Sequence, residues 1–261
     1  MAHRFALVTG AARRLGREMA LTLAREGCDV AVHYASSEED AQELVAAIEG
    51  LGRRAIALKA DLLNEEETQV LVERASTALG GSLDVLVNNA SIFEYDNIET
   101  ATRRSWDRHF ESNLRAPFVL TQQFARQVPE PQADLNGEPV ASGLIVQMVD
   151  QRVNKLTPEF TTYTLAKAGL WTLTQTAAQA LAPRVRVNAI GPGPTMQGAR
   201  QSRAHFTAQR AATILNRGAN PEEIAAALRY FLSAKSVTGQ LICVDGGQHL
   251  AWETPDIIGV E

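Results

Sequence analysis

The sequence lacks the features that would place a chain of 261 residues in a specialised class. It has two cysteines, Cys28 and Cys243, which are far apart and without metal-binding or redox spacing, so zinc fingers and disulfide scaffolds are excluded. No apolar run approaches the roughly 20 residues that a membrane-spanning helix needs, and the first residues do not have the pattern of a signal peptide. We therefore expect a protein of the reducing cytoplasm that does not enter a membrane.

The chain also lacks a basic region. Its 25 lysines and arginines are outnumbered by 30 aspartates and glutamates, which gives a formal net charge of −5. This balance argues against nucleic acid as a partner. The five histidines are scattered without ligand spacing, so no metal is expected. With 45% hydrophobic residues the chain can form a globular core, and a small molecule is the expected partner.

Short apolar runs alternate with amphipathic segments of helical length. Strand, helix and strand repeated in this way predict parallel strands joined by crossover helices. Continuous apolar strands are typical of a sheet that is buried on both sides. The sequence therefore predicts a single α/β domain over residues 1–261, with a Rossmann-like, doubly wound parallel sheet and helices on both faces. The predicted strands are Phe5–Val8, Asp29–Tyr34, Arg54–Leu58, Asp84–Val87, Leu144–Val149, Val185–Ile190 and Leu241–Val244.

Local signals mark helix starts and connections. Ser37-Glu-Glu-Asp40 has the pattern of a capping box, and Asn220 followed by Pro221 predicts another helix start. The stretch 128–142 contains three prolines and an Asn-Gly turn signal, so we expect a surface insertion. The segment 191–217 is long for a passive connection and predicts a loop that closes over a substrate.

The first predicted strand is followed by the turn Thr9-Gly-Ala-Ala-Arg-Arg-Leu-Gly16 and then by helical sequence. A glycine at position 10 permits a sharp turn, and one at position 16 permits close packing of the helix on the strand. The helix N-terminus then offers free N–H groups to a pyrophosphate. An ordinary tight turn is the alternative, but it leaves Arg13 and Arg14 unexplained at a helix N-terminus, where cations are unfavourable. An anionic dinucleotide explains both arginines.

The end of the second predicted strand indicates which dinucleotide is bound. Sites that prefer NAD usually place a carboxylate here for the ribose 2′-hydroxyl. After this strand no carboxylate is found before Glu38, and hydroxyls are present instead at Ser36 and Ser37. With Arg13 reaching from the first turn, this corner fits a 2′-phosphate, so NADP(H) is the expected cofactor.

Tyr163 and Lys167 lie four residues apart in a segment of helical character, which puts the phenol and the ammonium on one helix face. A nearby cation lowers the pKa of a tyrosine and makes its phenol a better proton shuttle near neutral pH. The alternative is a chance pair on a helix surface. The dinucleotide turn earlier in the chain favours the catalytic interpretation.

Together these residues resemble the short-chain dehydrogenases/reductases. The resemblance rests on Thr9-Gly10 and Gly16, Asn88-Asn89-Ala90, the Tyr163/Lys167 pair and Ile190-Gly-Pro-Gly193, and it extends to Val244-Asp-Gly-Gly247. It implies a seven-stranded parallel sheet, a nicotinamide cofactor and a homotetramer or dimer.

The resemblance also implies roles for individual residues. Tyr163 is the expected proton donor, Lys167 holds the nicotinamide ribose, and Asn113 anchors a water of the proton relay. Asp61 meets the adenine amino group. The expected cofactor contacts are Gly10, Arg13, Arg14, Leu15, Gly16, His33, Tyr34, Ser36, Asp61, Leu62, Asn89, Ala90, Ser91, Tyr163, Lys167, Pro192 and Gly193.

Two departures from the common family pattern resemble the pteridine reductase branch. Arg14 replaces the middle glycine of the first turn, and Asp150 replaces the serine usually found 13 residues before the tyrosine. Phe93 matches a phenylalanine that lies against the pterin ring in this branch, and bacterial dihydromonapterin and dihydrofolate reductases are similar. The expected catalytic residues are Tyr163, Lys167, Asp150 and Asn113, and the expected substrate contacts are Arg14, Phe93, Asp150 and Tyr163.

Asp150 bears on the kind of bond that is reduced. An ionised carboxylate beside a developing alkoxide would raise the barrier to ketone reduction, whereas reduction of a C=N bond needs a protonated nitrogen. The sequence thus predicts an NADPH-dependent reductase of a pteridine-type substrate. The alternatives are a carbonyl reductase of ketones or 3-oxoacyl thioesters, in which Asp150 pairs with Arg152 or Lys155, and a non-catalytic dinucleotide sensor. For Phe93 the alternative is packing in the core.

Overall fold

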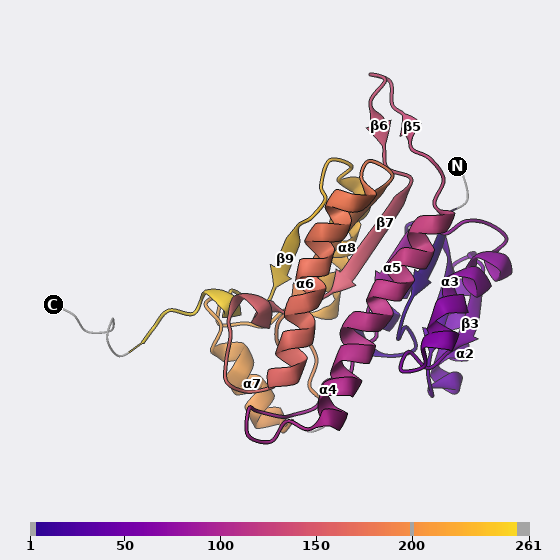
Figure 1. The fold of residues 1–261 in the computed structure, drawn as a ribbon. Coiled ribbons are helices and arrows are strands. Elements are labelled where there is room, and N and C mark those ends of the chain that lie inside the picture. Colours follow the sequence, from indigo (N-terminus) through magenta and orange to yellow (C-terminus); the bar gives the residue numbers. More distant parts are fainter. Residues whose placement is uncertain (1–3, 199–200, 255–261) are drawn as a thin grey trace.

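The apolar runs form one parallel sheet of seven strands, which the computed structural model describes within residues 4–198 and 201–254 (Figure 1). Its strand order is β3-β2-β1-β4-β7-β8-β9, and every neighbouring pair runs parallel. The predicted fold class is confirmed. The strands are β1 (Arg4–Val8), β2 (Cys28–Tyr34), β3 (Ala55–Lys59), β4 (Val85–Asn88), β7 (Gly143–Met148), β8 (Val185–Pro192) and β9 (Leu241–Val244).

The alternation of side chains along each strand divides the core into two layers. In β1, Ala6 and Val8 pack with buried side chains of α1 (Arg14–Arg25), α2 (Glu38–Glu49) and α8 (Pro221–Ser233). Leu7 packs instead with those of α3 (Glu65–Leu79), α5 (Ala116–Gln127) and α6 (Thr161–Leu181). Figure 1 shows α6, α5 and α3 lying side by side over their face of the sheet. Because both faces are covered, every residue of β2 and β7 is buried, which is why the strands read as continuous apolar runs.

Every α-helix lies on a connection between two strands of the large sheet, and α4 with α5 and α7 with α8 share a connection. The α-helices are α1 (Arg14–Arg25), α2 (Glu38–Glu49), α3 (Glu65–Leu79), α4 (Arg103–Phe110), α5 (Ala116–Gln127), α6 (Thr161–Leu181), α7 (Arg203–Ala211) and α8 (Pro221–Ser233). A π-helical turn, Glu111–Arg115, joins α4 to α5, and short 3-10 turns cover Gln151–Asn154 and Gln248–Leu250. Among the described residues, no helix combines the length and hydropathy needed to span a bilayer.

Both predicted helix starts are correct, because α2 begins directly after Ser37 and α8 directly after Asn220, but only α8 has the expected cap. At α8, Pro221 is the first helical residue, and the Asn220 N–H donates to the Glu223 carboxylate at 2.7 Å. The capping box predicted at α2 is wrong, since the Ser37 side chain makes no capping hydrogen bond. The Asp40 carboxylate, which would complete the box, instead accepts a hydrogen bond from Arg13 Nε at 2.6 Å. A long-range ion pair has therefore replaced the local cap.

The two irregular segments differ in how well they were predicted. The insertion lies between α5 and β7 as expected, and it contains an antiparallel hairpin, β5 (Gln132–Ala133) and β6 (Pro139–Val140), which projects from one end of the molecule in Figure 1. The segment 191–217 is not a loop throughout, which corrects the prediction. Its first two residues extend β8, and α7 forms in its second half because Ser202 accepts the His205 N–H at 3.1 Å as an N-cap.

The sheet gathers several loops at one edge. The chain builds β2 and β3 on one side of β1 and then continues with β4 on the other side, so the strand order reverses between β1 and β4. Ligands of doubly wound sheets bind at this switch point, beyond the carboxyl ends of the strands. The turns after β1, β4, β7 and β8 all lie at this edge, since the strands are parallel.

Candidate active site

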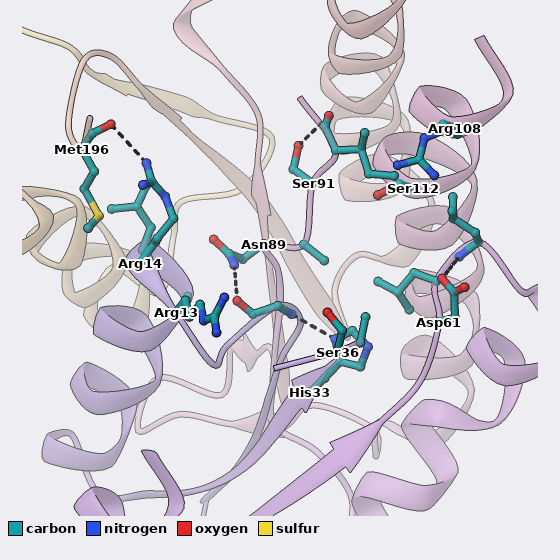
Figure 2. Close-up of a pocket in the computed structure, with 18 of the residues that line it drawn as sticks. Arg13, Arg14, His33, Ser36, Asp61, Asn89, Ser91, Arg108, Ser112 and Met196 are labelled. Carbon is teal, nitrogen blue, oxygen red and sulfur yellow. Dashed lines mark hydrogen bonds between the residues drawn. The ribbon is translucent and has the colours of Figure 1, made fainter. Parts of the chain in front are cut away.

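A cavity of about 670 Å³ lies at this edge of the sheet (Figure 2). Of the residues expected to contact a cofactor, it is lined by Gly10, Arg13, Arg14, Leu15, Gly16, His33, Ser36, Asp61, Leu62, Asn89, Ala90, Ser91 and Gly193. Tyr34, Pro192, Tyr163 and Lys167 are absent from its lining, as are Asn113, Asp150 and Phe93. The sequence missed Ala35, Leu63, Ile92, Arg108, Ser112, Thr195 and Met196, which also line the cavity. Most of these missed residues directly follow or precede predicted ones.

The turn after β1 is shaped by close contacts that only glycine permits. Gly10 has a φ of +58°, and a Cβ atom there would lie 3.0 Å from the Ala90 Cα. A Cβ on Gly16 would collide with the Gly10 carbonyl oxygen and lie 2.5 Å from the Asn89 amide nitrogen. Asn89 donates from this nitrogen to the carbonyls of Thr9 and Gly10, at 2.9 and 3.1 Å. The turn after β4 thus holds the turn after β1, and the N-terminus of α1 faces the cavity.

His33 holds the same turn from the β2 side. The Gly10 N–H donates to His33 Nδ1 at 2.9 Å, so the ring proton is on Nε2, which lies 3.0 Å from the Ala60 carbonyl oxygen. The side chain is buried, and burial lowers the pKa of His33 to about 4. A neutral imidazole therefore joins β2, the first turn and the end of β3.

The two arginines of the turn have different partners. Arg13 is exposed and pairs with Asp40, whose pKa is lowered by this contact. Arg14 has a φ of +54°, a left-handed conformation that is uncommon outside glycine and explains why the family pattern has glycine here. Its guanidinium donates to the Met196 carbonyl at 3.1 Å (Figure 2) and to the Gln197 carbonyl at 2.9 Å. Arg14 therefore joins the first turn to the segment that follows β8.

Tyr163, Asp150 and Lys167 meet at the carboxyl end of β7. The Tyr163 hydroxyl donates to Asp150 Oδ2 at 3.0 Å, and the Asp150 Oδ1 accepts the Arg152 backbone N–H at 2.8 Å. Lys167 is buried, and its Nζ donates to the Met148 carbonyl at 2.7 Å and lies 5.7 Å from the centre of the Tyr163 ring. The sequence register between Asp150 and Tyr163 thus corresponds to a direct hydrogen bond.

The pKa values of this group differ from the expectation in one respect. Burial and the adjacent Asp150 carboxylate raise the pKa of Tyr163 well above its ordinary value, whereas the sequence predicted a lowered one. Burial also raises the pKa of Asp150 and lowers the pKa of Lys167 to about 8. The prediction considered Lys167 alone and left out burial and the negative charge of Asp150, which both disfavour a phenolate. Tyr163 is a neutral hydrogen-bond donor.

Asn113 is in the π-helical turn, where it is fully buried. Its Oδ1 accepts the Ile92 N–H at 2.9 Å, and its Nδ2 donates to the Ile92 carbonyl at 2.8 Å. The amide therefore fixes the backbone directly before Phe93. The water-anchoring role of Asn113 stays a prediction.

Phe93 lies against Tyr163 and a residue that the sequence did not single out. The Phe93 ring stacks on Phe160, with centroids 4.4 Å apart and planes 12° apart, and contacts the Tyr163 ring edge-on at 4.7 Å. Because 47% of Phe93 is exposed, it is not a core residue. The Arg152 guanidinium lies 5.0 Å from the centre of the Phe160 ring. Phe160 precedes α6 with a left-handed backbone, so no helical spacing in the sequence indicated this contact.

Comparison with known proteins identifies the family of this chain. A family model described as Enoyl-(Acyl carrier protein) reductase matches residues 10–249. The 3-oxoacyl-[acyl-carrier-protein] reductase of Staphylococcus aureus is 33% identical over 250 residues, which cover 94% of this chain and 98% of that protein. Solved structures of FolM alternative dihydrofolate reductase 1 in complex with NADP, from Brucella canis and Brucella suis, are 42% and 43% identical. Both structures superpose on this chain with a TM-score of 0.90, and each match covers 97% of this chain. The match covers 97% of the Brucella canis chain and 98% of the Brucella suis chain. The chain therefore belongs to the short-chain dehydrogenase/reductase family of oxidoreductases.

Proposed function

We propose that this protein is an NADPH-dependent reductase of a pteridine-type substrate, such as a dihydropterin or dihydrofolate. The observation that carries the proposal is the hydrogen bond from Tyr163 to the partly buried Asp150, beside the half-exposed ring of Phe93. The two FolM dihydrofolate reductases, which share 42% and 43% of their residues with this chain, support it.

The cavity fits a dinucleotide. The N-terminus of α1 faces it, and the contacts around Gly10 and Gly16 leave no room for a side chain where a pyrophosphate would approach. Arg13, in the turn after β1, and Ser36, after β2, line the cavity and would bind a 2′-phosphate. Asp61 also lines the cavity and would hold the adenine. The FolM structures contain NADP. When bound, this cofactor supplies the hydride.

The residues around Tyr163 would manage the proton. Because its pKa is raised, the Tyr163 phenol keeps its proton at neutral pH. This single proton is directed at Asp150 Oδ2 in the structure, and it would turn from Asp150 to the substrate nitrogen when it is donated. Asp150 orients the phenol through its Oδ2 atom and, as a carboxylate or a carboxylic acid, can bind an amine or a ring N–H of a pterin. Phe93 would stack on the ring, which adds about 0.5–1.5 kcal/mol beyond the burial of area.

Reduction of a ketone or a 3-oxoacyl thioester is the second candidate, and the Staphylococcus aureus relative favours it. Asp150 argues against it in its carboxylate form, because a carboxylate in contact with Tyr163 would oppose the developing alkoxide. A non-catalytic sensor has no need for the buried contacts that join Tyr163, Asp150 and Lys167. For the assembly we propose a homotetramer or a dimer of this chain.

The test is the oxidation of NADPH in the presence of a panel of substrates: a dihydropterin, dihydrofolate, an oxidised pterin, a small ketone and a 3-oxoacyl thioester. We expect turnover with at least one pteridine. Asp150→Ser should strongly lower the rate with pteridines, leave the affinity for NADPH nearly unchanged and leave ketone reduction neutral or improved. A wild type that reduces ketones efficiently and none of the pteridines would establish the second candidate instead.

A further inference from the structure

Helix α6, which carries Tyr163 and Lys167, begins without a cap of its own. The residue before it, Phe160, has φ +58° and ψ +48°, and its side chain offers no hydrogen-bond acceptor. A non-glycine residue in this left-handed region is strained, and it persists only where surrounding contacts hold it. The contacts that hold it come from a distant part of the chain.

Asp96, in the segment between β4 and α4, supplies the missing cap. It is 2% exposed, and its backbone carbonyl accepts the Phe160 N–H at 2.7 Å. Its Oδ1 accepts the Thr162 N–H at 3.1 Å, and its Oδ2 accepts the Thr162 hydroxyl at 2.5 Å. These hydrogen bonds lower the pKa of Asp96 although burial opposes the shift. The carboxylate therefore stays charged, facing the positive end of the α6 dipole.

His109, in α4, contacts the same Thr162 hydroxyl that donates to Asp96. It is fully buried, and its Nε2 accepts the Glu94 N–H at 3.1 Å. Its proton must then be on Nδ1, which lies 2.6 Å from the Thr162 hydroxyl oxygen and donates to it. Every proton is assigned, since the hydroxyl of Thr162 accepts from His109 and donates to Asp96. One hydroxyl thus links α4, α6 and the segment that carries Phe93.

We propose that Asp96, Thr162 and His109 are positioning residues, which hold the first turn of α6 so that the Tyr163 hydroxyl meets Asp150 and the Phe160 ring stacks on Phe93. Thr162 directly precedes Tyr163, and Asp96 lies three residues beyond Phe93, so the network is connected to both sides of the site. This inference rests on the proposed role of Tyr163 as proton donor and on no particular substrate.

The decisive variants change one hydroxyl. Thr162→Val has nearly the same shape and removes both hydrogen bonds of the side chain, while Thr162→Ser keeps them. Thr164→Val is the matched control, because the Thr164 hydroxyl is also buried in α6 but has no hydrogen-bond partner among the described residues. A small misplacement of a catalytic group can lower the rate on the order of 10²-fold. We expect Thr162→Val to lower kcat roughly ten- to a hundredfold, with little change in KM for NADPH. Thr162→Ser should restore most of kcat, and Thr164→Val should resemble the wild type.

A second pair of variants separates the two bonds of His109 and covers the case in which Thr162→Val fails to fold. An asparagine amide reaches about as far as Nδ1, and a glutamine amide about as far as Nε2. His109→Asn should keep the bond to Thr162 and most of kcat, whereas His109→Gln should lose that bond and part of kcat. The proposal is overturned if Thr162→Val stays within about twofold of the wild-type kcat, or if Thr164→Val loses as much.

Each comparison uses the substrate that the wild type reduces fastest, so a ketone would serve as well as a pteridine. If the wild type reduces nothing in the panel, the proposed function fails by itself. The network is then tested by amide hydrogen exchange, which should become faster at Phe160 and Thr162 in Thr162→Val and not in Thr164→Val. Unchanged exchange in both variants would overturn it.

Discussion

At the scale of single residues, the direction of the Tyr163 pKa shift decides what the phenol can do. Tyrosine can serve as an acid only if it holds its proton at the working pH, and burial beside Asp150 ensures this. Removal of a single positioned acid lowers the rate about 10²–10⁴-fold. We therefore expect Tyr163→Phe to lose this much kcat and to keep its affinity for NADPH, measured by titration of cofactor fluorescence. Tyr230→Phe, at an exposed tyrosine in α8, is the control and should be neutral.

Lys167 gives the site a limit at high pH. Burial lowers its pKa to about 8 in the cofactor-free protein, so its ammonium form is lost as the pH rises through that value. We expect kcat/KM for NADPH to fall above about pH 8, since this parameter reports the ionisation of the free enzyme. Lys167→Arg, which stays charged, should have lower activity but no such decline. If kcat/KM of the wild type stayed constant up to about pH 10, roughly two pH units above the pKa of Lys167, the role given to the Lys167 ammonium would be contradicted.

The Arg13–Asp40 pair sets the expected choice between cofactors. Arg13 is exposed and lines the cavity, and a 2′-phosphate bound there would share Arg13 with Asp40 or replace Asp40 as its partner. A charge-assisted hydrogen bond contributes about 1.5–3 kcal/mol, or roughly ten- to a hundredfold in affinity. Arg13→Ala should weaken NADPH binding by this factor and leave NADH binding unchanged, as measured by calorimetry. Arg25→Ala, at the other end of α1, is the matched control. Equal affinities of the wild type for both cofactors would disprove the preference.

At the scale of elements, the junction of β1 and α1 is the least tolerant part of the fold. A Cβ on Gly16 would collide with the Gly10 carbonyl, and backbone atoms cannot move aside as a side chain can. Overpacking of this kind destabilises a protein by about 1–3 kcal/mol. We expect Gly16→Ala to lower the free energy of unfolding in urea by this amount and to weaken NADPH binding. Gly50→Ala, where a Cβ would lie 3.4 Å from the nearest atom, should do neither.

Elements that depend on buried apolar runs could be predicted from the sequence, and those that depend on distant partners could not. The strands were placed within one or two residues because a parallel sheet buries both faces of each strand. The cap of α2 was wrong because Asp40 pairs with Arg13, which is 27 residues away. The start of α6 depends on Asp96, 66 residues before Thr162, and no local pattern indicates such a cap.

In the candidate site, too, features that follow from the strand pattern could be predicted, and features that depend on distant partners could not. Thirteen expected cofactor contacts line the cavity, because turns that follow parallel strands meet at one edge of the sheet. The contact of Asp150 with Tyr163 also agrees with the sequence register. Phe160 was missed because its left-handed backbone is imposed by Asp96 and turns its ring onto Phe93. Arg14 was expected to contact a ligand. Its hydrogen bonds to Met196 and Gln197 could not be predicted, because they depend on where the segment after β8 lies in the fold.

At the scale of the whole molecule, the buried His33 couples global stability to pH. Its pKa is about 4 in the folded protein and about 6.5 in an unfolded chain, so the unfolded state binds more protons between these values. The free energy of unfolding must therefore decrease as the pH falls from about 6.5 towards 4, by up to about 3 kcal/mol from this residue. His109, whose pKa burial also lowers, acts in the same direction.

The test compares the free energy of unfolding in urea at about pH 7.5 and about pH 5 for the wild type, His33→Gln and His205→Gln. His33→Gln cannot titrate and should lose part of the pH dependence, although it is less stable than the wild type at the higher pH. His205 is exposed, so its variant should keep the full dependence. The other titrating groups are common to all three proteins and cancel in the differences. If His33→Gln kept the wild-type dependence, the turn around Gly10 would not be held by a neutral His33, and the hydrogen bond from the Gly10 N–H would need another explanation.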